Sequence, residues 1–265
     1  MSHLVWRKLV LVVLGATTMA LALPGCSKRS SDQPPGGVAE ANGAGQPDEP
    51  GEPVITLTDS ESQQQAFAVE ALQALGATGS FKSSPDGFFG GLPGGIAGVE
   101  TDDAGIVRGV DLIDTEVTDD DLKHLTAFPH LQRLHLMGAK ISDAGLENLS
   151  RLTALEKLDL SNTDTSQAGI AFLKDLKKLR LLRLDGTNVG DDALPVIGAL
   201  EGLETLYLSD TQVTNAGLDG LGNLKQLKLL QLQFCKGVTS GGIKQLKKRL
   251  PDCKIIAGGN TIIEY

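Results

Sequence analysis

The sequence predicts an α/β solenoid, a right-handed stack of short units with a parallel sheet on its concave side and short helices on its convex side. One observation is a run of apolar residues, L-x-x-L-x-L, that returns in constant steps of 24 residues between 107 and 232. A second is the set of three apolar positions that closes each unit, spaced as on one face of a helix. No single unit can bury its apolar face alone, so the units are expected to stack.

Three leucine columns carry the repeat. Because side chains alternate along a strand, Leu134 and Leu136 face the core and His135 faces the opposite side. The columns consist of Leu131, Leu155, Leu179, Leu203, Leu227; Leu134, Leu158, Leu182, Leu206, Leu230; and Leu136, Leu160, Leu184, Leu208, Leu232. Val107, Val110 and Leu112 extend them one step towards the N-terminus. Each helical segment is expected to begin at a hydroxyl N-cap such as Ser142 or Ser166.

These units resemble the leucine-rich repeat family. "AKISDAGLENL" and "TQVTNAGLDGL" match its short type T-x-[VI]-[ST]-[DN]-A-G-L-x-x-L, whereas "TDTSQAGIAFL" and "TNVGDDALPVI" depart at single positions. The resemblance covers residues 106–256 and implies a leucine-rich-repeat solenoid with six repeats over 106–250. This short type is common in exported bacterial proteins and is related to repeats of eukaryotic ubiquitin-ligase substrate receptors. That receptor role stays an alternative, although the adaptor-binding helical module it needs would lie where a signal peptide and a tether are predicted.

One position in each turn corresponds to the buried asparagine of that family. A hydroxyl there can donate and accept hydrogen bonds, so we expect this structural ladder to link neighbouring turns. Ala139 interrupts the ladder. Its members are Thr115, Thr163, Thr187, Thr211 and Cys235.

Both ends of the array need caps. Residues 54–105 are predicted to form an N-terminal cap, with a helix that begins near Thr58 and ends at Gly76, followed by a glycine-rich loop over 85–98. This loop is either a mobile binding loop or a segment whose two phenylalanines pack over the first repeat. Residues 251–265 are predicted to form the C-terminal cap, because a proline ends the last helix and "CKII" offers a final strand.

The first 53 residues indicate the cellular location of the protein rather than its fold. Two basic residues precede an apolar run of signal-peptide length, and "LPGC" then resembles the lipobox of bacterial lipoproteins. The resemblance implies that residues 1–26 form a lipoprotein signal peptide, that Cys26 is lipidated, and that the chain is exported and lipid-anchored at the cell membrane or outer membrane. An ordinary signal peptide and a secreted soluble chain are the alternative. Residues 27–53 are Pro/Gly/Ser/Ala-rich and predict a disordered tether.

Composition and motifs argue against several function classes. The net charge is −9, which opposes nucleic-acid binding. The sequence lacks the common metal, nucleotide and hydrolase motifs, so we expect no cofactor, no metal site and no catalytic residue, with an enzyme as the least favoured alternative. Cys235 and Cys253 fall at opposite ends of the predicted sheet, which predicts two buried free thiols and no disulfide.

The remaining candidate is the concave face. Side chains opposite the core leucines include an arginine, a tyrosine and exposed leucines, which are typical of protein interfaces. We therefore expect a non-enzymatic, membrane-anchored module that binds a protein partner; a solvated face without a partner and a self-associating envelope protein stay open. The candidate partner-binding residues are Arg133, His135, Lys157, Asp159, Leu181, Arg183, Asp185, Tyr207, Leu229 and Gln231.

Overall fold

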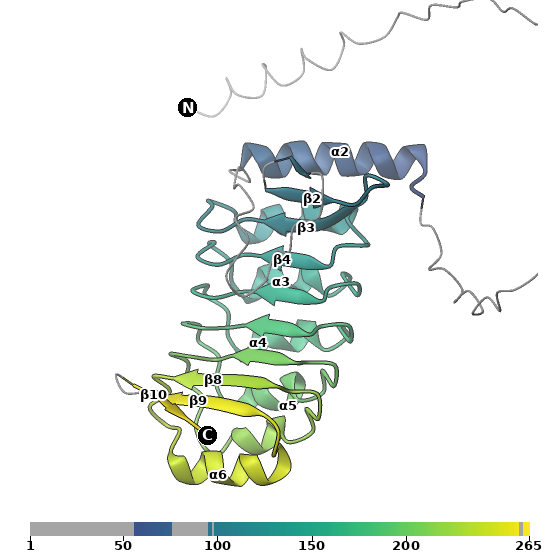
Figure 1. Cartoon of the computed structure of the whole chain (residues 1–265). Helices are drawn as coiled ribbons and strands as arrows, with labels where there is room; N and C mark the ends of the chain where they lie inside the picture. The colour runs from purple at the N-terminus through teal and green to yellow at the C-terminus, as the bar shows by residue number, and fades with distance from the viewer. Residues whose placement is uncertain (1–55, 76–94, 97, 260–261) are drawn as a thin grey trace, which may run out of the picture. The chain divides into compact units, whose positions relative to one another are not determined.

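The computed structural model describes residues 56–75, 95–96, 98–259 and 262–265. Within these residues ten strands form one sheet in chain order. They are β1 (Gly95–Ile96), β2 (Val99–Thr101), β3 (Val107–Asp111), β4 (Arg133–His135), β5 (Lys157–Asp159), β6 (Leu181–Arg183), β7 (Thr205–Tyr207), β8 (Leu229–Gln233), β9 (Lys254–Gly258) and β10 (Ile262–Glu264). Neighbours from β3 to β9 are parallel, whereas β1, β2 and β10 are added antiparallel. Figure 1 shows the stack, and the predicted α/β solenoid is confirmed.

The 24-residue step of the sequence becomes the register of the sheet. Leu134 pairs with Leu158, and Leu158 with Leu182, so each core leucine lies directly beside its equivalent in the next unit. All fifteen column leucines are at most 4% exposed. Burial of one such side chain stabilises the fold by about 1.5–3 kcal/mol, so these columns supply a substantial share of the apolar driving force.

Short helices cover the other side of the sheet (Figure 1). They are η1 (Asp119–Ala127), α3 (Asp143–Leu149), α4 (Gln167–Ile170), η2 (Ala171–Leu173), η3 (Asp191–Ala193), α5 (Leu194–Ile197), η4 (Leu218–Leu221) and α6 (Ser240–Arg249), where η marks 3₁₀ helices. The predicted N-caps are confirmed at Ser142 and Ser166. Their hydroxyl oxygens accept the N–H groups of Ala144 at 3.3 Å and Ala168 at 3.2 Å, which satisfies donors that lack a partner in the first turn.

An aspartate ladder, which we did not predict, joins one unit to the next. Asp119 accepts the backbone N–H of Ser142 at 2.8 Å and its hydroxyl at 2.5 Å. Asp143 holds Ser166 in the same way, at 2.7 and 2.6 Å. Each N-cap is therefore fixed by a carboxylate 23 residues earlier, and hydrogen bonds to a charged acceptor are stronger than neutral ones. Asp191 and Thr214 repeat the arrangement, at 2.7 and 2.6 Å.

This ladder explains the glycine in the repeated "AG". A Cβ at Gly145 would stand 3.1 Å from Asp119 Cγ and would overlap its carboxylate oxygen, so only glycine leaves room for the ladder. One unit breaks all three parts of the rule together. Gln167 replaces the aspartate, Gly190 replaces the hydroxyl N-cap, and Ala193 stands where the units on either side have Gly169 and Gly217. Without the carboxylate, a methyl group fits and is fully buried.

The threonine ladder is present, but the expected link between neighbouring turns is found at the last rung, where Thr211 Oγ1 lies 3.5 Å from Cys235 Sγ. The hydroxyls of Thr115, Thr163, Thr187 and Thr211 donate to the carbonyl three residues earlier in their own unit, at 2.6–2.8 Å. The sharp turn after each strand brings that carbonyl within reach, so the local bond is the one that forms. Cys235 is different, because its thiol lies 3.0 Å from the Leu208 carbonyl of the preceding unit. Cys235 and Cys253 are both free and buried, as predicted.

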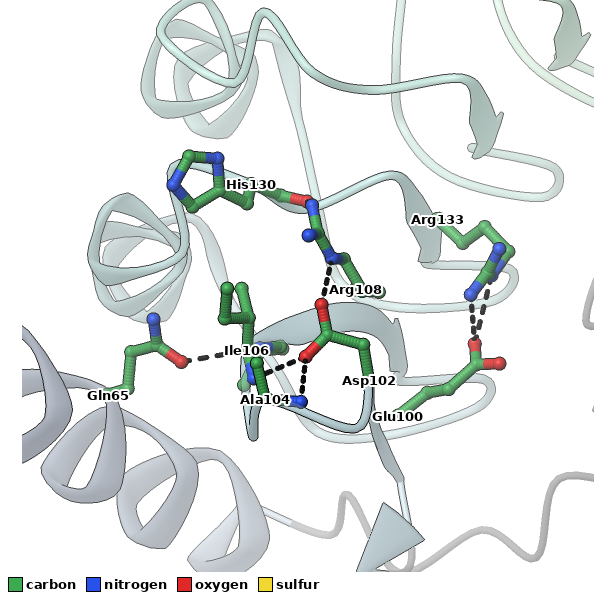
Figure 2. A network of polar contacts seen from close by, with 9 residues as sticks. Gln65, Glu100, Asp102, Ala104, Ile106, Arg108, His130 and Arg133 are labelled. Atoms are coloured by element: carbon green, nitrogen blue, oxygen red, sulfur yellow. Dashed lines mark hydrogen bonds and ion pairs between the residues drawn. The ribbon is translucent and has the colours of Figure 1, made fainter. Parts of the chain in front are cut away.

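The N-terminal end is closed by α2 (Asp59–Ala74), whose N-cap Thr58 forms a capping box with Glu61. Gln65 on this helix is buried and accepts the Val107 N–H at 3.3 Å, which ties the cap to β3 (Figure 2). Phe67 lies on this helix but outside its buried face. It is 65% exposed, because Ala68 and Leu72 form the face that meets the repeats.

The rest of the N-terminal cap differs from the prediction at one point. The described residues between 95 and 101 form β1 and β2, which extend the sheet where only a loop was expected. Asp102 follows β2 and closes a turn by accepting the N–H groups of Ala104 and Ile106, at 3.0 and 2.9 Å, and the Arg108 guanidinium at 2.8 Å (Figure 2). The predicted signal peptide and tether, and most of the loop at 85–98, lie outside the described residues.

Candidate functional site

The open face is the sheet surface opposite the helices, the one predicted to be concave. Two neighbouring columns of side chains run along it, because each strand is paired in register with the next. One column consists of Arg133, Lys157, Leu181, Thr205 and Leu229, and the other of Asp111, His135, Asp159, Arg183, Tyr207 and Gln231. The predicted candidates are thus brought together on one surface, with Asp185 two residues beyond the second column.

A charged cluster occupies the middle of the second column. Asp159 is 0% exposed, and its Oδ2 atom lies 3.0 Å from His135 Nε2 and 3.6 Å from the Arg183 guanidinium. The other oxygen of Asp159 accepts the Ser161 N–H at 2.8 Å. On the far side of the imidazole, Asp111 Oδ1 lies 3.8 Å from His135 Nδ1. We expected these side chains to be exposed, but Asp159 and His135 are buried because the adjacent strands stand only ~4.8 Å apart.

Arg183 links this buried cluster to the surface. Its guanidinium carbon lies 4.5 Å from the centre of the Tyr207 ring, a cation–π arrangement. The side chain is therefore fixed between a buried carboxylate on one side and an aromatic face on the other. Arginine and tyrosine held in this way lose little freedom when a partner binds, which favours them as interface anchors.

Two aspartates on this face are held in unfavourable surroundings. Burial raises the pKa of Asp185 even though the Ser209 N–H donates to its carboxylate at 2.7 Å. Burial also raises the pKa of Asp111, against the opposing effects of a backbone N–H and of His135. Among the described residues, Arg183 is the one cation whose charge lowers the pKa of Asp185, and His135 is the one that lowers the pKa of Asp111.

The first column begins with an ion pair that sequence reasoning missed. Arg133 donates from Nε to one oxygen of Glu100 at 2.9 Å, and its Nη2 atom forms an ion pair with the same oxygen at 2.8 Å (Figure 2). Glu100 comes from β2, whose three residues gave no periodic signal. Next to this pair, burial lowers the pKa of Lys157, and the Arg133 charge adds to the effect. The N-terminal part of the open face thus carries Arg133 and Lys157, beside the Asp111, His135 and Asp159 of the second column.

Leu181 does not have the exposure that we predicted. It is 9% exposed and belongs to the buried apolar residues. Its register neighbours Lys157 and Thr205 stand one strand spacing away on either side and shield it. Leu229 is half-buried and keeps an apolar surface at the C-terminal end of the column.

The chemistry of this surface is that of fixed charges on rigid strands. Among the residues that the structure describes, no group of three or more His, Cys, Asp or Glu side chains could hold a metal ion. His124 and His130 lie outside the two columns, near the N-terminal cap. No helix in the described part of the chain is both long and apolar enough to span a membrane.

The stacked units with one open sheet face define a repeat solenoid. Residues 129–150 match the family model described as Leucine Rich repeat. One similar solved chain belongs to the complex of the Arabidopsis receptor kinase HAESA with the peptide hormone IDA and the co-receptor SERK1. It has 20% identity and a TM-score of 0.50, and the match covers 72% of this chain and 33% of that chain. The fold is therefore that of leucine-rich repeat proteins.

A second similar structure is an internalin from Listeria monocytogenes. It has 23% identity and a TM-score of 0.43, and the match covers 52% of this chain and 37% of that one. The chain thus spans about a third of the length of either solved chain. No curated relative matches the sequence.

Proposed function

We propose that the chain is a non-enzymatic module that binds a protein partner through the open face. The observation that carries this proposal is the cluster of Asp159, His135 and Arg183. Burial of charged groups costs stability even when they are paired, and apolar side chains of similar volume would often serve the fold better. A charged cluster fixed on the sheet face beside Tyr207 is best explained by recognition.

The similar fold of the Arabidopsis complex supports the class of partner. That structure contains a receptor kinase together with a peptide hormone and a co-receptor, so a solenoid of this kind can take part in protein and peptide recognition. The open face of this chain offers the elements of such recognition, since an aromatic ring, a fixed guanidinium and several carboxylates lie on it. We propose Arg183 and Tyr207 as anchors, with Asp185 and Gln231 beside them.

We further propose that the chain works outside the cytoplasm, held at a membrane by a lipid on Cys26. The support is the sequence "LPGC" behind an apolar run, followed by a tether of 27 residues at 27–53. A flexible coil of that length has a mean reach of roughly 30 Å, which would lift the solenoid off a membrane without fixing its orientation. Acyl labelling and fractionation test this address. Labelled, membrane-bound wild type and unlabelled Cys26→Ser are expected, and soluble, unlabelled wild type contradicts the anchor.

Cross-linking in the native cell envelope tests the binding face. The double variant Arg183→Glu/Tyr207→Ala should lose the partners that wild type captures, because it reverses one anchor charge and removes the ring. The matched control Lys244→Glu/Gln245→Ala makes the same kinds of change on exposed α6 and should keep them. Equal capture by both double variants contradicts binding through the open face, provided that circular dichroism shows both to be folded.

A further inference from the structure

Phe234 breaks a rule that every other unit keeps. The first residue of each turn has a positive φ, in the left-handed region that favours Gly, Asn and Asp. The residues of this turn column are Asp114 (49°), Gly138 (72°), Asn162 (56°), Gly186 (68°), Asp210 (53°) and Phe234 (60°). The column also alternates in size, since the side chains of Asp114 and Asn162 cover Gly138 and Gly186 respectively. By this alternation position 234 should hold glycine.

The phenylalanine is unfavourable for the fold in two ways. A bulky residue in the left-handed region is strained. Its side chain is also 49% exposed, so much of its apolar surface stays in water. The backbone is held there because the Phe234 N–H donates to the Gly258 carbonyl at 2.7 Å, and the turn at Gly259 lies along one edge of the ring. The other side of the ring stays open.

That open side forms the wall of a groove of about 410 Å³. Its other lining residues are mostly polar and belong to the turns of three successive units, among them Gly186, Asn188, Asp210, Gln212 and Lys236. Gln212 donates to Asn188 at 3.5 Å across the groove. Phe234 is the one large apolar side chain of this lining, and it directly follows Gln233 at the end of β8. The groove therefore continues the open face around the edge of the sheet.

The charge near the groove defines what it would accept. Asp210 is exposed in the groove, and Asp185 lies on the adjoining edge of the open face directly before Gly186. Neither carboxylate has an ion pair within 4.0 Å in the part of the chain that the structure describes, and burial raises the pKa of Asp185. A cation placed between them would be attracted by both. Lys236 lines another part of the groove and would repel a cation there, so the preference for a cation is confined to the part near Asp210.

We propose that this groove docks an extended peptide segment of a protein partner, with an apolar side chain against Phe234 and a basic side chain against Asp210 and Asp185. The inference rests on the proposed function, because the groove extends the same binding face. It adds a class of ligand and a position for its anchor. Such an anchor accounts for a residue that neither the turn geometry nor the core explains.

Panning of a random 12-residue peptide library on the purified full chain tests the proposal. Enriched peptides should combine an aromatic or aliphatic residue with a nearby Arg or Lys. A synthetic copy of an enriched peptide, measured by fluorescence anisotropy, should bind Phe234→Asn at least about 10-fold more weakly than wild type, as expected for a hot-spot truncation. Asp210→Asn should weaken binding about 3-fold and reduce its salt dependence. Asp114→Asn, in the same column but outside the groove, should bind as wild type does.

Stability separates this role from a structural one. Asn restores the residue type of the turn, so Phe234→Asn should melt within about 3 °C of wild type. A larger fall, or unchanged peptide affinity, or enrichment of acidic or no peptides, overturns the groove proposal. If the groove fails while Arg183→Glu/Tyr207→Ala still loses its cross-linked partners, binding through the open face stands. If instead the peptide binds the groove as predicted and Arg183→Glu/Tyr207→Ala keeps its cross-linked partners, the groove proposal stands and binding through the open face is contradicted.

Discussion

Replacement of Gly145 by alanine tests the aspartate ladder directly. The new methyl carbon would stand 3.1 Å from Asp119 Cγ, where ordinary contacts begin at 3.4 Å, and closer still to the carboxylate oxygen. Asp119 must move away. Its bonds to the Ser142 N–H and hydroxyl, 2.8 and 2.5 Å long, would then be broken.

The expected size of the effect follows from these contacts. Each hydrogen bond to a charged group contributes about 1.5–3 kcal/mol, and the lower value applies because the pair is partly buried. The loss of both is about 3 kcal/mol. Alanine returns about 0.5–1 kcal/mol through its better helix propensity. The free energy of unfolding should therefore fall by about 2 kcal/mol, which lowers the melting temperature by about 4–8 °C for a domain of this size.

A double-mutant cycle in urea isolates the cause. Asp119→Ala alone should destabilise the chain, and Gly145→Ala in that background should be neutral or slightly stabilising, which gives a coupling energy of about 2 kcal/mol. Crowding by Leu122, whose Cδ1 would lie 3.0 Å from the methyl group, is present in both backgrounds and cancels. Ala193→Gly is the control, with an expected cost of about 0.5–1 kcal/mol. If Gly145→Ala costs the same with and without Asp119, the glycine is not there for the ladder.

Three further predictions use the titrating groups. Burial raises the pKa of Asp185, so its ionised form destabilises the fold. Asp185→Asn should therefore have a higher melting temperature than wild type at pH 7, and this difference should disappear below about pH 4, where Asp185 is protonated. An unchanged melting temperature at pH 7 contradicts the prediction. For Asp102 the sign is opposite. Burial alone would raise its pKa, but hydrogen bonds from Ile106 and Arg108 hold it below the ordinary value, so its stabilisation is lost as pH falls below about 4. Asp102→Asn should accordingly melt lower at pH 7 and match wild type in acid. Finally, Cys235 and Cys253 are both buried, and burial raises the pKa of the Cys253 thiol to about 11. In a chain without the N-terminal cysteine, a thiol reagent at pH 8 should therefore label neither of them before denaturation. Rapid labelling of the native chain would show that the core is open.

Periodic features were predictable because periodicity is a property of the sequence itself. The 24-residue step gave the register of β3 to β8 and the identity of the fifteen column leucines. Hydroxyl N-caps were predictable from local chemistry, as Ser142 shows. Strands β1 and β2 were not, because two or three residues beside a glycine-rich run carry no alternation. The aspartate ladder was visible in the repeated "[ST][DN]AG", but its meaning needed the contact across 23 residues.

The candidate face was predicted in outline, but its burial was not. Alternation along a strand placed His135 and Asp159 opposite the core, and the sheet has them there. Alternation says nothing about neighbours in the same column, which is why Asp159 is buried rather than exposed and Leu181 is shielded. Glu100 was missed for a related reason, since its partner Arg133 lies 33 residues away and no repeat step connects them.

Departures from the repeat rule fall into two kinds, and the difference between them indicates function. Gln167, Gly190 and Ala193 depart together, and each change removes the need for the others, so the fold loses little. Phe234 departs alone. Its strain and exposure are offset by no change in Asp210 or Gly186, the neighbours in its column. Because an uncompensated cost to stability persists only where something other than stability is gained, the single departure is the better marker of a binding site.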